Sequence, residues 1–76
     1  MGNNKEKSER FKRVASKRVD NVINNIRSLS KCSNKNNYSY EKEDVTKMIK
    51  AIKDEIKIME TLYRKNLSDK NDKFNF

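Results

Sequence analysis

The sequence contains no histidine, no tryptophan and no proline, and it has one glycine and one cysteine. Histidine is the side chain that enzymes use most often for general acid and base catalysis, and without it the thiol of Cys32 has no imidazole to activate it. A single glycine is too few for the glycine-rich loops that cradle phosphates. We therefore expect a protein that is not an enzyme and has no small-molecule substrate.

The single cysteine also limits how the fold is held together. Cys32 cannot form a disulfide within the chain, and one cysteine without histidine cannot make a zinc site. We therefore expect no metal, no cofactor, a reducing cytoplasmic setting and a packing role for this thiol. No apolar run approaches the roughly 20 residues that a membrane-spanning helix needs, so we also expect no membrane partner.

What the sequence has in excess is positive charge. Its 76 residues include 19 lysines and arginines and 11 acids, which gives a net charge of +8 and a pI near 9.8. Such a balance indicates nucleic acid or another acidic surface as a partner. Abundant lysine, asparagine and isoleucine are also typical of an AT-rich genome, in which case the lysines serve to keep the helices in solution.

The arginines are harder to attribute to genome composition, because lysine could supply the same charge. Four of the five arginines lie within the first 27 residues. Residues 1–35 carry ten basic and three acidic side chains, whereas residues 36–76 carry nine and eight. The positive charge is therefore concentrated in the N-terminal half of the chain.

The spacing of apolar residues predicts a helix over residues 8–30. Steps of four or three residues place six apolar side chains on one face. These are Phe11, Ala15, Val19, Val22, Ile26 and Leu29. The opposite face carries a ridge of cations and amides, and we expect its cations to contact nucleic acid. We call these five residues the basic ridge: Arg10, Arg13, Lys17, Arg27 and Lys31.

A second helix is predicted over residues 41–66. Its main apolar stripe alternates steps of four and three residues, as in packed helix pairs. The stripe consists of Val45, Ile49, Ile52, Ile56, Met59 and Tyr63. Acids near the start and cations near the end match the helix dipole. Glu43 with Lys47, and Glu60 with Arg64, are spaced for ion pairs along this helix.

Together these patterns predict an all-α domain over residues 8–67, folded as an antiparallel two-helix hairpin with a connector at residues 31–40. Residues 1–7 and 68–76 are expected to be flexible. A hairpin has no second layer to cover its apolar residues, so we expect it to complete a helical bundle. A homo-oligomer, most simply a dimer, or a protein partner would supply the remaining helices.

Two features are candidates for a protein interface. A flank of the second helix, beside its main stripe, carries Ala51, Ile58 and Leu62. The connector carries Tyr38 and Tyr40, which can stack on bases, anchor a partner, or fold over the open end of the hairpin. We expect the two tyrosines to close the hairpin, and we keep both as interface candidates.

The stretch from residue 10 to residue 52 resembles a group of small, mostly uncharacterised bacterial proteins, often from mobile elements. The shared pattern is IR.L....N..NY.Y...DV.K, and it falls here on Ile26, Arg27, Leu29, Asn34, Asn37, Tyr38, Tyr40, Asp44, Val45 and Lys47. The resemblance implies a bacterial, plasmid or phage setting. It also implies that the tyrosines and the start of the second helix form one structural unit, but it implies no activity and no functional residue.

The sequence thus supports two hypotheses of function. In the first, a non-enzymatic basic protein contacts nucleic acid, or a nucleic-acid-bound assembly, through the basic ridge of the first helix. In the second, the chain is a protein-only module, such as a small inhibitor or adaptor encoded by a phage or plasmid. It would then dock through the apolar flank of the second helix.

Overall fold

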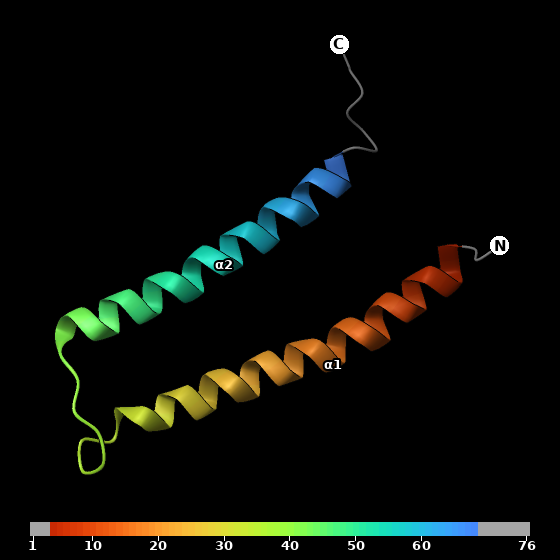
Figure 1. Ribbon diagram of the computed structural model, residues 1–76. Helices are drawn as coiled ribbons and strands as arrows, with labels where there is room; N and C mark the ends of the chain where they lie inside the picture. Colours follow the sequence, from red (N-terminus) through yellow and green to blue (C-terminus); the bar gives the residue numbers. More distant parts are fainter. Residues whose placement is uncertain (1–3, 69–76) are drawn as a thin grey trace. The chain divides into compact units, whose positions relative to one another are not determined.

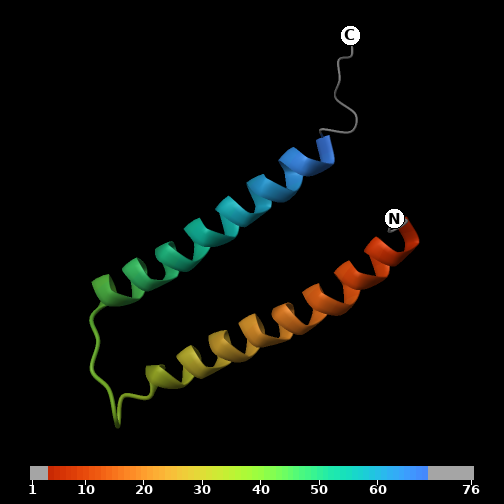
Figure 2. The same ribbon diagram turned by 45° about the vertical axis from the view of Figure 1, so that its right-hand side comes forward.

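The computed structural model describes residues 4–68, and within this range the secondary structure is helical, with no strand. Helix α1 spans Asn4–Ser30, the 3-10 helix η1 spans Lys31–Ser33, and helix α2 spans Lys42–Ser68. Figures 1 and 2 show each of the two long helices as one unbroken ribbon. The all-helical class predicted from the sequence is therefore confirmed.

Both long helices extend further than the sequence patterns predict. α1 begins four residues before Ser8, so residues 4–7 are helical and not the flexible segment we expect from the sequence. α2 begins one residue later than predicted and ends at Ser68. Proline and glycine have the lowest helix propensities, and neither occurs in residues 4–68. Neither helix is therefore shortened by one of these residues. The predictions for residues 1–3 and 69–76 lie outside the described residues.

The structure divides the chain into two units, Met1–Ser39 and Tyr40–Phe76. The first contains α1 and η1, and the second contains α2. The single hairpin domain over residues 8–67, and the bundle that would complete it, stay predictions.

Neither long helix has a buried residue. On the α1 stripe, Phe11 and Val22 keep 53% and 55% of their surface exposed, and on the α2 flank Ile58 and Leu62 keep 54% and 56%. A helix in a protein gains most of its stability by packing an apolar face, and propensity alone contributes little. Both helices therefore present apolar faces that need a cover.

α1 passes into η1 without a break. Ser30 keeps helical dihedral angles, φ −60° and ψ −30°, and its hydroxyl donates to the carbonyl of Ile26 at 3.0 Å. The helical path ends at Asn34, whose ψ of 108° is extended. Within η1, Cys32 is exposed, so the packing role that the sequence predicts for its thiol is wrong.

α2 begins with a side-chain cap. The Oδ2 atom of Asp44 accepts the backbone N–H of Glu41 at 2.7 Å. The carbonyl of Glu41 in turn accepts the N–H groups of Asp44 and Val45, at 3.0 and 3.3 Å. The carboxylate three residues into the helix thus plays the part that Glu or Gln plays in a capping box. The predicted start of the second helix therefore has a specific physical cause.

The two ion pairs predicted for α2 have different outcomes. Arg64 contacts Glu60 at 3.1 Å, as predicted. Glu43 and Lys47 form no ion pair with any described residue, and Asp54 pairs instead with the lysine four positions before it, Lys50, at 2.8 Å. Each pair is exposed on the helix surface, so each contributes a few tenths of a kcal/mol.

The cap predicts that Asp44→Ala destabilises α2 more than Glu43→Ala does. Both substitutions remove an acid from the first turn, but the first also leaves the N–H of Glu41 without its side-chain acceptor. We expect Asp44→Ala to cost about 1 kcal/mol, which lowers the thermal midpoint by about 4–8 °C in a chain of this size. Thermal unfolding followed by circular dichroism measures the midpoint of each variant. Equal decreases of the midpoint in the two variants would contradict the cap.

Candidate functional site

The structure places the basic ridge along the first unit. Arg10, Arg13, Lys17 and Arg27 lie on α1, and Lys31 is the first residue of η1; all five are exposed. A helix repeats every 3.6 residues, so these positions fall on the side opposite the apolar stripe. Because α1 runs directly into η1, Lys31 follows Arg27 about one turn further on. The five predicted residues therefore share one polar surface.

The arginines of α1 are not engaged in ion pairs. α1 carries four arginines, and none of them forms an ion pair with another residue in the range 4–68. They are Arg10, Arg13, Arg18 and Arg27. α2 behaves differently, since it pairs Lys50 with Asp54 and Arg64 with Glu60. No cation of the basic ridge therefore has an acid of residues 4–68 within ion-pair distance.

Three acids interrupt the N-terminal part of the ridge. Glu6 and Glu9 each precede a ridge arginine by four residues, and Asp20 follows Lys17 by three. These spacings put the acids on the same face of α1 as the cations. After Asp20 the next acid is Glu41. The ridge thus has a mixed N-terminal part and a C-terminal part that contains no acid.

The part of the chain without acids, residues 21–40, combines several groups that can bind nucleic acid; we call it the acid-free segment. It carries three cations, Arg27, Lys31 and Lys35. It also carries six amides, at Asn21, Asn24, Asn25, Asn34, Asn36 and Asn37. Lys35 is not among the predicted site residues, although the gap between the two flanking acids is visible in the sequence. Amides and cations together are typical of surfaces that contact phosphates and base edges.

A turn around Asn34 shapes the end of this segment. The backbone N–H of Asn34 donates to the carbonyl of Lys31 at 3.3 Å. The carbonyl of Asn34 accepts the N–H groups of Asn37 and Tyr38, at 3.2 and 3.0 Å. Its side-chain Oδ1 accepts the N–H of Asn36 at 3.0 Å, which is the asparagine turn that this residue type favours. Two successive hydrogen bonds therefore connect the backbone of Tyr38 to that of Lys31.

The two connector tyrosines differ in exposure. Tyr38, in the first unit, keeps 51% of its surface exposed, so its ring is not buried. Tyr40, in the second unit, is half-buried. That the tyrosines close the hairpin stays a prediction, but of the two rings Tyr38 is the more available to a ligand.

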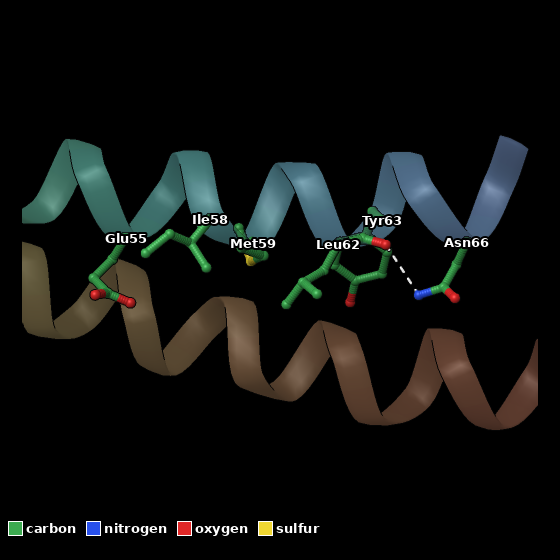
Figure 3. Close-up of a pocket in the computed structure, with 6 residues that line it drawn as sticks. All are labelled: Glu55, Ile58, Met59, Leu62, Tyr63 and Asn66. Atoms are coloured by element: carbon green, nitrogen blue, oxygen red, sulfur yellow. Dashed lines mark hydrogen bonds between the residues drawn. The ribbon is translucent and has the colours of Figure 1, made fainter.

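On α2, two of the three predicted flank residues line a shallow hollow. Figure 3 shows six side chains that extend from one side of the helix around it: Glu55, Ile58, Met59, Leu62, Tyr63 and Asn66. Ala51 is not among them. The Nδ2 atom of Asn66 donates to the carbonyl of Leu62 at 3.0 Å, so this amide is held along the helix. The hollow joins the flank to the main stripe through Met59 and Tyr63, which makes the apolar surface of α2 wider than either row alone.

Two further properties of residues 4–68 bear on function. No helix in this range is long and apolar enough to cross a membrane. The same residues contain no group of histidine, cysteine, aspartate or glutamate side chains that could hold a metal ion.

Comparison with protein-family models, with curated proteins and with solved structures finds no match. The resemblance to small bacterial proteins of mobile elements therefore stays a prediction.

The exposed position of Cys32 gives a direct check on the segment next to the ridge. Its thiol should react completely with a disulfide reagent under native conditions, at a rate close to that of the chain in denaturant, because reaction depends on access to the sulfur. Absorbance of the released thiol measures the rate. A thiol that reacts only after unfolding would contradict this position of η1.

Proposed function

We propose that this protein binds nucleic acid, or an assembly that contains it, through the basic ridge. The observation that carries the proposal is the set of exposed arginines on one face of α1 that form no ion pair with the described residues. Cations placed along one face can meet phosphates and release their condensed counterions, which is the main source of affinity in such complexes. Phosphate contacts position a protein but do not read sequence, so this surface alone predicts binding with little sequence preference.

The apolar stripes of the two long helices support a hairpin in which these helices pack together. From Ala15 to Leu29 and from Val45 to Met59, both stripes use the same alternation of four and three residues. We infer that the stripes pack against each other as an antiparallel hairpin, so that the basic ridge faces outward. The flank around Ile58 and Leu62 is then free to contact a second copy, and a dimer would complete a four-helix bundle.

The ridge is tested by removing charge from one helix at a time. Arg13, Lys17 and Arg27 replaced together by alanine should weaken binding to short oligonucleotides and reduce its dependence on salt. Each lost phosphate contact should lower the slope of log affinity against log salt concentration by about 0.7 to 0.9. Fluorescence anisotropy at several salt concentrations measures both the affinity and the slope.

A matched control separates the ridge from the net charge. Lys47, Lys53 and Lys57 on α2 replaced by alanine also lower the net charge from +8 to +5. If the ridge binds nucleic acid, this α2 variant should keep most of its affinity. Equal losses in the two triple variants would show that overall charge, and not the ridge, attracts the polymer. Undetectable binding of the unmodified chain at low salt would exclude the proposal.

A second candidate function rests on the hollow of α2. Ile58 and Leu62 are each more than half exposed, and the hollow joins them to the main stripe. Exposed apolar side chains that gather on one helix face are typical of helices that dock on a protein. In this alternative the chain is an inhibitor or adaptor, and the basic ridge serves to keep it in solution.

The basic ridge and the apolar flank respond to different substitutions. Ile58→Asp puts a charge into the apolar flank, so it should abolish self-association or capture of a protein partner while oligonucleotide binding persists. Thr46→Asp makes the same change of charge on the polar side of α2 and should leave association intact. Equilibrium sedimentation of both variants measures self-association. A chain that sediments as a stably folded monomer before any substitution would contradict the dimer.

A further inference from the structure

We propose that the acid-free segment is a binding site for single-stranded nucleic acid, in which Tyr38 stacks on a base while Arg27, Lys31 and Lys35 contact the neighbouring phosphates. This inference rests on the proposed function, because it names the kind of nucleic acid that the same unit of the chain would bind. It also moves the centre of the site from the middle of α1 to its C-terminal end and the turn beyond it.

The first support is the distribution of acids. Glu6, Glu9 and Asp20 lie among the cations of the N-terminal part of the ridge. A phosphate backbone that followed the whole length of α1 would meet these carboxylates, and like charges repel. Residues 21–40 contain three cations and no acid, so a polyanion meets the least repulsion there.

The second support is the aromatic ring within this segment. Tyr38 belongs to the same unit as Arg27 and Lys31, and half of its surface is exposed. Base stacking on aromatic side chains, combined with nearby cations, is how proteins bind single strands with little sequence preference. Bases in a duplex are already stacked on each other, so an exposed ring on a turn has no free base face to contact there.

The third support is the fixed backbone of the turn. The backbone hydrogen bonds from Tyr38 to Asn34 and from Asn34 to Lys31, at 3.0 and 3.3 Å, hold the backbone of Tyr38 in the turn beyond the end of α1. The Oδ1 atom of Asn34 accepts the N–H of Asn36, which adds a third bond within the same few residues. A ligand therefore does not have to order the backbone of this turn, which reduces the entropy cost of binding.

One electrostatic effect opposes the site. The C-terminal end of a helix carries a partial negative charge of about half an elementary charge, and the segment lies at the end of α1. Three full positive charges on Arg27, Lys31 and Lys35 exceed this partial charge several-fold. The local field therefore remains attractive to phosphate.

The test compares three labelled probes of equal length: oligothymidylate, oligouridylate and a mixed-sequence duplex. Fluorescence anisotropy at low salt should show tighter binding to a single strand than to the duplex. Tyr38→Ala should weaken single-strand binding about five- to 150-fold, which corresponds to the loss of one stacked base. Its salt dependence should stay unchanged, whereas Lys31→Ala should lower the slope by about 0.7.

Two matched variants identify stacking as the cause. Tyr38→Phe keeps the aromatic face and should retain affinity, whereas Tyr38→Leu keeps apolar bulk and should lose it. Circular dichroism confirms that the helices are intact in each variant. A preference for oligouridylate over oligothymidylate, or the reverse, shows which of the two strands the site favours, and either supports the site.

The outcomes that overturn the inference differ from those that overturn the proposed function. Tighter binding to the duplex, or unchanged single-strand binding in Tyr38→Ala, overturns the inference and leaves ridge-dependent binding standing. A Tyr38 that affects self-association and not oligonucleotide binding assigns the ring to a protein interface and also overturns it. Absence of binding to all three probes at low salt overturns both.

Discussion

Two long helices with uncovered apolar faces set the main physical constraint on this protein. The local interactions within each helix, such as the cap at Asp44 and the ion pairs of α2, contribute about 1 kcal/mol or less each. Covering a single leucine or isoleucine contributes about 1.5 to 3 kcal/mol. The apolar faces therefore decide whether the helices are stable. Whatever covers them, helix against helix or a second chain, also decides which polar surfaces remain exposed.

The sequence predicts the helices well because their signals are local. Apolar steps of four and three residues, together with acids around the start of α2, correctly predict two helices and the connector between them. The start of α1 is less predictable, because residues 4–7 are polar and carry no apolar period, although helical hydrogen bonds still form there. The exposure of Cys32 and the difference between Tyr38 and Tyr40 depend on which neighbours each residue meets. Composition and spacing do not contain that information.

In the candidate site, too, local spacing predicts some features, whereas others depend on which residues meet in the structure. Helical spacing correctly places four ridge residues on α1 and extends the ridge to Lys31 through η1. The net charge of the N-terminal half does not show that its acids and its cations lie on the same face of α1 as far as Asp20. The hydrogen bonds of Asn34, which hold Tyr38 near the end of the ridge, follow from a known preference of asparagine, but no spacing rule predicts the partners it selects.

The broad apolar surface of α2 has a consequence for how the chain tolerates insertions and deletions. Its two rows of side chains lie next to each other around the helix, and each residue added or removed turns all later residues by about 100°. One residue inserted before Ile58 would leave the helix, its charge and its composition nearly unchanged. It would nevertheless turn Met59 and Tyr63 away from the row that begins at Val45, and bring Ile58 and Leu62 into that row in their place. A substitution on this helix changes one contact at a time, whereas a shift of register changes which side chains make up the main row at every later position.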